Sequence, residues 1–180
     1  MLAGRGDDVV FGGTGDDLVF AGSGSDVVSG GTGGDVLSGQ GGAEILDGDG
    51  GDDRIRGGGG DDILLDGLGN DTVVGGGGDD TFIYVQGSLE GDATATTDRF
   101  VGGRGNDTLL VVLDQVSFDA FELAETDVVL DALGITDISI ETVMVLNGRS
   151  AVEDILGGND LFVLGDFWGL LPAPTDDLVV

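Results

Sequence analysis

A nine-residue repeat fills the first part of this chain and limits the folds that it can adopt. Nine copies follow one another from Ala3 to Ile83 without insertion or deletion, beginning AGRGDDVVF, GGTGDDLVF and AGSGSDVVS. In every copy the fourth residue is Gly, the sixth is acidic and the eighth is apolar. A fixed period of this kind is typical of a repeat architecture, in which each unit buries its apolar side chain by stacking on its neighbours.

Each repeat divides into a turn and a short strand. Positions one to six are rich in Gly, which adopts the positive φ angles of tight turns without steric strain. Positions seven to nine are β-branched or otherwise apolar and predict a three-residue strand. Because side chains alternate across a strand, the residue at position eight is expected to face inward, while positions seven and nine face outward.

Stacking of these units predicts an all-β fold with two repeats per coil and one strand on each of two faces. Strands of neighbouring coils lie about 4.8 Å apart, so residues two repeats apart are expected to stack directly. The position-six acids then form two columns. Asp8 lies under Asp26 in one column, and Asp17 lies under Asp35 in the other.

Stacked carboxylates at this spacing repel one another and call for a cation. The chain has 35 Asp and Glu against six Lys and Arg, a net charge of −29. Calcium takes six to eight oxygen ligands at about 2.3–2.6 Å, and a Gly-rich turn offers backbone carbonyls beside the carboxylate. The predicted ligands at position six are Asp8, Asp17, Asp26, Asp35, Glu44, Asp53, Asp62, Asp71 and Asp80. The position-four glycines, predicted to let the backbone approach the ion, are Gly6, Gly15, Gly24, Gly33, Gly42, Gly51, Gly60, Gly69 and Gly78.

The pattern G-G-x-G-x-D-x-U-x, with U an apolar residue, resembles the calcium-binding nonapeptide of RTX proteins over all 81 residues of the array. The resemblance implies a right-handed parallel β-roll, with calcium ions between successive turns held by the position-six acid and turn carbonyls. Departures from the pattern are few. Glu44 is one methylene longer than Asp, and Gln40, Asp49 and Asp66 replace glycines.

The spacing of the acids predicts the number of ions. The intact array contains gaps for roughly seven calcium ions, on the ligand geometry above, and Asp98 offers an eighth because it follows Asp80 by two repeat lengths. Residues 84–101 then form one degenerate coil, and residues 102–110 form a further repeat with Asp107 at position six. In this register Asp107 stacks over Leu89 and has no acidic partner.

Composition excludes several classes of function. The absence of Cys and His removes disulfides, thiolate metal sites, the usual zinc ligand and the usual general base. The strongly acidic balance argues against nucleic acid as a partner, and the longest aliphatic run is too short to span a membrane. No nucleotide-binding or nucleophile motif occurs, so a non-enzymatic module is expected.

Several outward positions are apolar, which is unusual for a solvated face. They are Val9, Phe11, Val27, Ile45, Ile63, Leu65 and Ile83 on one face, with Leu18 and Phe20 on the other. An apolar patch of this size marks packing against another surface. Two explanations remain open: the C-terminal segment folds back over it, or it forms a homodimer or partner interface.

The chain after residue 110 loses the Gly periodicity. We predict a β-roll domain over 1–110 and a β-rich cap over 111–180, since the open end of a roll exposes unpaired strand edges. Within the cap, a helix is predicted after Asp119, a strand over Ile138 to Leu146, and an out-of-phase repeat over 157–165. The last four residues, Asp177 to Val180, are similar to the C-terminal ends of type I secretion substrates, serralysin-like proteases in particular.

These features together predict a calcium-binding module that is disordered without calcium and folds on extracellular calcium. The resemblance implies a bacterial protein that is secreted by the type I machinery, which becomes a partner together with calcium. Two alternatives remain. One is the C-terminal part of a secreted protease, lipase or alginate epimerase. The other is an adhesin or ice-binding solenoid, although only Thr14 and Thr32 stack at position three on one side.

Overall fold

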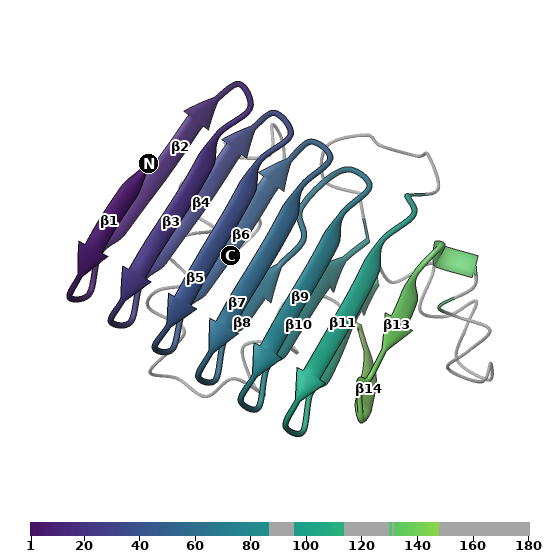
Figure 1. Ribbon diagram of the computed structural model, residues 1–180. Helices are drawn as coiled ribbons and strands as arrows, with labels where there is room; N and C mark the ends of the chain where they lie inside the picture. Colours follow the sequence, from purple (N-terminus) through teal and green to yellow (C-terminus); the bar gives the residue numbers. More distant parts are fainter. Residues whose placement is uncertain (87–95, 114–129, 131, 148–180) are drawn as a thin grey trace, which may run out of the picture.

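A computed structural model describes residues 1–86, 96–113, 130 and 132–147 of the 180-residue chain. Fourteen strands form two parallel seven-stranded sheets that lie face to face, joined by turns along both edges (Figure 1). The first sheet contains β1 (Leu2–Arg5), β3 (Leu18–Ser23), β5 (Val36–Gly41), β7 (Arg54–Gly59), β9 (Thr72–Gly77), β11 (Arg99–Arg104) and β13 (Thr136–Ile138). The second contains β2 (Val9–Thr14), β4 (Val27–Thr32), β6 (Ile45–Gly50), β8 (Ile63–Leu65), β10 (Thr81–Val85), β12 (Thr108–Leu113) and β14 (Thr142–Asn147).

The strand register confirms two repeats per coil. Val9 pairs with Val27, and Val27 pairs with Ile45, so each step along a sheet is two nonapeptides. The same step joins β3 to β5 in the first sheet, where Leu18 pairs with Val36. The molecule is therefore an all-β parallel β-roll, as the sequence predicts.

The strands are longer than predicted. Most run for six residues, from position seven of one repeat to position three of the next, as in β2 and β4. The predicted three-residue strand is wrong because the glycines at positions one to three also pair in register, as Gly13 does with Gly31. The turn is confined to positions four to six, where Gly60 has a φ of 127° that an L side chain rarely adopts.

The interior of the roll is built from the position-eight side chains. From Val19 onward they are 0–2% exposed, and they form one continuous core. Phe82 and Phe100 are the largest members, with ring centroids 5.8 Å apart in an edge-to-face arrangement. The inward direction of position eight is thus confirmed from the second coil to the end of the array.

The register changes after β10, and the predicted degenerate coil over 84–101 is wrong. Arg99 pairs with Thr72 and Thr108 pairs with Thr81, so both steps are three nonapeptides instead of two. The extra nine residues fall between Gln86 and Thr96. Asp98 consequently stacks on Asp71 rather than on Asp80. In this register Phe100 packs against Tyr84 and Phe82 across the interior.

Both sheets continue past residue 110. β13 pairs with β11, and β14 pairs with β12 over six residues from Thr108↔Thr142 to Leu113↔Asn147. The predicted strand from Ile138 to Leu146 is therefore divided between β13 and β14. Of the helix predicted after Asp119, the described residues Leu130, Ala132 and Leu133 are helical. The rest of that segment, the repeat over 157–165 and the last four residues lie outside the described residues.

The outer face of the second sheet differs between its two ends. Leu65, Ile83, Leu110 and Val112 form a second apolar cluster and are at most 6% exposed, although they point away from the roll interior. Phe11, on the same face near the N-terminus, is 53% exposed. The apolar outer surface predicted from the sequence is thus covered over β8, β10 and β12 and open over β2.

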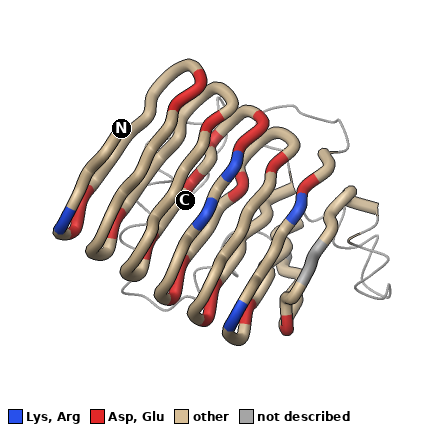
Figure 2. The backbone as a smooth tube through the Cα atoms, viewed as in Figure 1, with Lys and Arg blue, Asp and Glu red and all other residues tan. Residues whose placement is uncertain are grey.

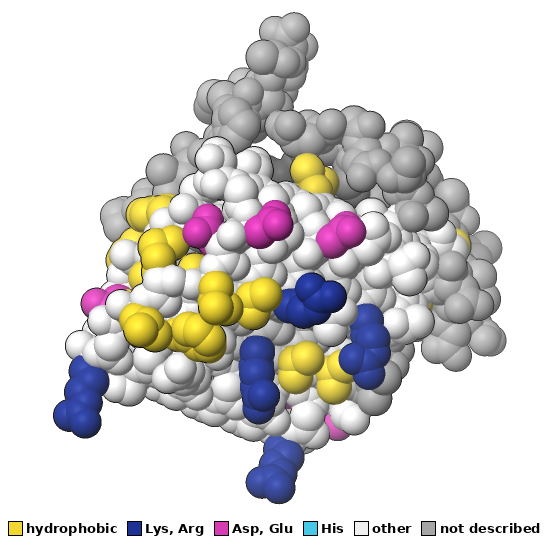
Figure 3. Space-filling model, turned by 45° about the horizontal axis from the view of Figure 1, so that its top comes forward, with side chains coloured by type: hydrophobic (Ala, Val, Ile, Leu, Met, Phe, Trp, Pro, Cys, Tyr) yellow, Lys and Arg dark blue, Asp and Glu magenta, His cyan; other side chains and the backbone are white. Residues whose placement is uncertain are grey.

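The outer face of the first sheet is mixed. Leu18 and Val36 are exposed and stand in one row with Arg54, since these three residues pair in register. Figure 3 shows such apolar side chains next to arginine side chains on the surface. Arg54 and Arg56 are exposed, which fits the surface role expected of these positive charges on an acidic chain.

Candidate metal sites

The turns bring the position-six acids into two columns, one along each edge of the roll. Figure 2 shows acidic residues concentrated at these turns. The turns that lead into the second sheet carry the first column: Asp8, Asp26, Glu44, Asp62, Asp80, Asp107 and Glu141. The turns that lead into the first sheet carry the second column: Asp17, Asp35, Asp53, Asp71 and Asp98. All eleven acids predicted from the sequence are thus placed in columns.

A hydrogen-bond ladder fixes one oxygen of most of these carboxylates. Except at Asp26 and at the last acid of each column, the backbone amide of each acid donates to the carboxylate one coil further along, at 2.7 Å from Asp17 to Asp35 and at 3.1 Å from Asp62 to Asp80. The ladder crosses the change of register, since the Asp80 amide donates to Asp107 at 3.0 Å. The prediction that Asp107 stacks over Leu89 without an acidic partner is therefore wrong.

The second carboxylate oxygen is left without a partner. In eight acids, Oδ2 is buried and accepts no hydrogen bond: Asp8, Asp26, Asp35, Asp53, Asp62, Asp71, Asp80 and Asp107. Buried carboxylate oxygens are normally paired with a donor or a cation, because desolvation of an unpaired charge is costly. A regular row of such oxygens along each edge is what a series of oxygen-ligated cation sites requires.

In most repeats a glycine at position one supplies the space beside the free oxygen. A Cβ built on Gly30 would lie 2.5 Å from Oδ2 of Asp35 and 2.8 Å from the carbonyl oxygen of Gly48 on the next coil. Carboxylate and carbonyl oxygens therefore converge on a space that Gly30 leaves open. Both are the oxygen types that calcium prefers, so the donor set and the space fit a calcium ion.

Burial makes the charged form of these carboxylates unfavourable in the absence of a cation. It raises the pKa of Asp53 to about 8 and the pKa values of Asp71 and Asp80 to about 7. The amide hydrogen bond of the ladder opposes this rise, and the carboxylates of neighbouring coils add to it. Burial likewise raises the pKa values of Asp35, Asp62, Asp98 and Asp107. A divalent cation would reverse both causes by neutralising the stacked charges.

Glu44 is the irregular member of the first column. Both of its carboxylate oxygens are buried, and neither accepts a backbone hydrogen bond. The hydrogen-bond ladder of the described coils is therefore broken between Asp26 and Glu44, which lie on neighbouring coils. Burial, followed by the neighbouring Asp62 carboxyl, raises the pKa of Glu44 to about 8. Its extra methylene group displaces the carboxylate from the position that Asp takes in other coils.

The structure adds acids that the sequence prediction did not include. Glu141 extends the first column, accepting a hydrogen bond from the Asp107 amide at 2.8 Å. The available signal was the run Glu141-Thr142-Val143, which repeats the acid-x-apolar pattern of Asp107-Thr108-Leu109. Asp66 joins Asp71 and Asp98 inside the roll. Its signal was the loss of glycine at position one.

Position five forms a second, exposed ladder in the opposite direction. Oδ1 of Asp16 accepts a hydrogen bond from the Gly34 amide, and Oδ1 of Asp61 accepts one from the Asp79 amide, both at 2.9 Å. These side chains cap the amides of the next coil on the solvent side. The frequent Gly-Asp-Asp triplet of the repeats therefore places one acid in the buried column and one on the surface.

Two parallel sheets joined by Gly-rich turns, with columns of buried carboxylates along both edges, define a calcium-binding β-roll. A comparison with protein families matches the RTX calcium-binding nonapeptide repeat, four copies, to residues 2–37, 20–55, 38–65, 56–87 and 92–110. These matches cover more than half of the chain, which therefore belongs to the RTX calcium-binding nonapeptide repeat family. The repeat of this family is a structural calcium-binding unit and not a catalytic one.

Comparisons with curated proteins and with solved structures gave no match. Among the residues that the structure describes, no helix is long and apolar enough to cross a membrane.

Proposed function

We propose that this chain is a module whose folding is coupled to calcium binding between successive coils. The observation that carries the proposal is the row of buried carboxylate oxygens that accept no hydrogen bond, Oδ2 of Asp35 and Asp53 among them. The position-six acids of neighbouring coils, together with turn carbonyls, hold the ion. Calcium supplies positive charge and a cross-link between coils, and binding free energy of this kind contributes directly to folding.

The calcium-free chain is expected to be disordered at neutral pH. The folded form would bury many carboxylates whose raised pKa values reflect a strong preference for the neutral state, as at Asp53. An unfolded chain hydrates the same charges, and a net charge of −29 opposes compaction. Removal of calcium therefore favours the unfolded state.

This coupling fits a secreted protein. Calcium modules that work outside the cell bind at about 10⁻⁴–10⁻³ M, far above free calcium in the cytosol. The chain would remain unfolded inside the cell, pass through a type I export channel, and fold outside. RTX repeats are typical of secreted bacterial proteins, which supports this assignment. The module acts without a catalytic group of its own, as a folding and stability element of the secreted protein.

Calcium titration followed by far-UV circular dichroism and isothermal titration calorimetry tests the proposal. The first column has six gaps between successive acids and the second has four. We therefore expect close to ten bound ions, more than the seven or eight predicted from sequence spacing. A disordered spectrum that becomes β-rich on calcium addition supports the proposal. A β-rich spectrum in metal-free buffer that calcium leaves unchanged would refute it.

A matched pair of variants separates specific binding from charge screening. Asp35→Asn removes a buried carboxylate of the second column, whereas Asp16→Asn removes one exposed carboxylate of the same turn region. Both variants lose one negative charge. Asp35→Asn is expected to raise the calcium concentration needed for folding, and Asp16→Asn is expected to change it little. Equal effects of the two substitutions, or equal folding in sodium chloride of the same ionic strength, would contradict calcium ligation.

A further inference from the structure

Repeat eight carries an aspartate where the other repeats of the array carry Gly or Ala. Asp66 stands at position one, points into the roll and is 2% exposed. The second sheet is interrupted at this residue: β8 ends at Leu65, and pairing with the preceding coil resumes only at Leu68, which bridges to Gly50. At the equivalent Gly57 a Cβ would collide with Oδ2 of Asp62.

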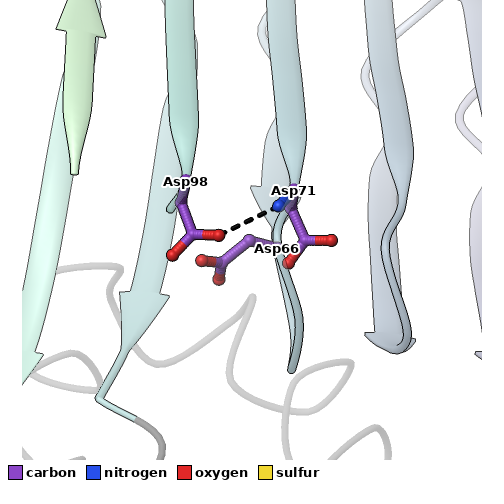
Figure 4. Close-up of side chains that lie close together, drawn as sticks. All are labelled: Asp66, Asp71 and Asp98. Carbon is purple, nitrogen blue, oxygen red and sulfur yellow. Dashed lines mark hydrogen bonds between the residues drawn. The ribbon is translucent and has the colours of Figure 1, made fainter. Parts of the chain in front are cut away.

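The Asp66 carboxylate enters one particular gap of the second column. One carboxylate oxygen each from Asp66, Asp71 and Asp98 lie within 4.8 Å of one another, and all three side chains are buried. Figure 4 shows the Asp66 carboxylate directed toward that of Asp98, beside Asp71. This gap holds three carboxylates, where a regular gap is bounded by two position-six acids.

The free oxygens in this cluster point to a ligand. Oδ2 of Asp66 and Oδ2 of Asp71 are buried and accept no hydrogen bond. Both carboxylate oxygens of Asp98 are held by hydrogen bonds. Oδ1 accepts from the Asp71 amide at 2.9 Å, and Oδ2 accepts from the Thr96 hydroxyl at 2.7 Å. Three buried carboxylates of like charge are stable together only with a cation or with protons between them.

We propose that Asp66, Asp71 and Asp98 form a calcium site of higher affinity than the regular gaps, and that this site fills first and selects the register of the chain. The inference rests on the proposed function, because it assigns a rank and a role to one of its sites. Calcium affinity rises with the number of charged ligands and with the rigidity of the site. The third carboxylate and the two hydrogen bonds that orient Asp98 supply both.

The role in register follows from the ambiguity of the sequence at this point. Asp98 lies two repeat lengths after Asp80, so spacing alone allows it to stack on Asp80 in the first column. In the structure it stacks on Asp71, three repeat lengths away, and nine residues are left between Gln86 and Thr96. Only the observed register gives Asp98 a third carboxylate from Asp66. Calcium bound by the three acids therefore stabilises this register against the alternative.

The test compares the full chain with two substitutions of Asp66, with calcium as the probe. Calorimetry in the presence of a competing chelator resolves tight ions from weak ones. In the unaltered chain we expect one ion that binds at least about tenfold more tightly than the rest. Asp66→Gly restores the consensus glycine and Asp66→Asn keeps the side-chain shape; both are expected to lose the tight step and to retain the weaker ions.

Asp49→Gly is the matched control. Asp49 is also an acid that replaces a consensus glycine, and it has a φ of 66°, which glycine adopts readily. It lies in β6, outside the two columns, and its carboxylate accepts a hydrogen bond from the Ser29 hydroxyl. Asp49→Gly removes the same type of side chain and the same charge as Asp66→Gly. We expect Asp49→Gly to retain the tight calcium ion.

The outcomes distinguish this inference from the proposed function. Failure of the unaltered chain to bind calcium at all would refute both. Ten ions that bind with equal affinity, or a tight step that survives in Asp66→Gly, would refute the role of Asp66 while leaving calcium-coupled folding intact. A tight step that survives only in Asp66→Asn would show that Asp66 is a protonated, structural acid, and would also overturn the proposal.

Discussion

Acidification of the calcium-free protein should promote its folding. In the folded state, burial raises the pKa values of Glu44, Asp47 and Asp53 to about 8 and those of Asp71 and Asp80 to about 7. Unfolded Asp and Glu titrate near pH 4. Between these values the folded chain retains protons that the unfolded chain has released. The folded state is therefore favoured at acid pH and loses stability as the pH rises from about 4 to about 8.

The size of the effect follows from the number of protons held in excess. Each excess proton changes the folding equilibrium about tenfold per pH unit. Five acids titrate in this window, but neighbouring carboxyls share their protons, so we take one net proton as the minimum. A decrease from pH ~7.5 to pH ~5.5 should then raise the ratio of folded to unfolded chain at least about 100-fold.

Circular dichroism and size-exclusion chromatography of metal-stripped protein measure this ratio. Metal should be removed by a chelating resin, because soluble chelators lose affinity at acid pH. We expect an extended chain at neutral pH and a more compact, β-rich chain near pH 5.5. The affinity of the folded protein for calcium should instead fall at acid pH, because calcium and protons compete for the same carboxylates. A calcium-free chain that is as disordered at acid pH as at neutral pH would refute the reasoning.

Three further predictions concern stability in saturating calcium, measured by urea unfolding. Glu44→Asp should restore the missing step of the hydrogen-bond ladder and stabilise the protein by about 1 kcal/mol; a loss of stability would show that the longer side chain is needed. Gly78→Ala should lower the free energy of unfolding by about 1–3 kcal/mol, because Gly78 has a φ of 136° and a Cβ would meet backbone. Gly77→Ala is the control and should have a smaller effect, since nothing lies within 4 Å of a Cβ at Gly77. Leu110→Ala should lower the free energy of unfolding by about 2–5 kcal/mol, because Leu110 is fully buried on the outer face of the second sheet. An equal loss for Phe11→Ala, at an exposed position of the same face, would contradict the difference between the two ends of this sheet.

The regular part of the fold could be predicted from the sequence because its determinants are local and repeat unchanged. One arrangement of the chain satisfies a nine-residue period with an acid at position six and an apolar residue at position eight. Two repeats form a coil, Val28 and Leu37 face inward, and Asp35 stacks on Asp17. Each coil repeats the contacts of the one before, so an inference made once holds along the array. The calcium-ligand roles of these acids stay predictions until binding is measured.

The sequence was insufficient where a residue has two permitted partners. Spacing placed Asp98 over Asp80 and left Asp107 without an acid. The tertiary structure instead stacks Asp98 on Asp71 and Asp107 on Asp80. This register brings Phe100 edge-on to both Phe82 and Tyr84 inside the roll, and apolar burial of this kind has no signal in local spacing.

The sequence also could not show which of the outward-facing apolar residues are buried. Phe11 and Ile83 occupy the same repeat position on the same face, yet Phe11 is 53% exposed and Ile83 is 1% exposed. The role of Asp66 was hidden in the same way, since its approach to Asp98 crosses the change of register. The repeat by itself thus determined the coil, the inward face and the acidic columns, because these depend on contacts between identical units. Only the tertiary structure decided the register after β10 and the covered part of the outer face, because these depend on contacts between unlike segments.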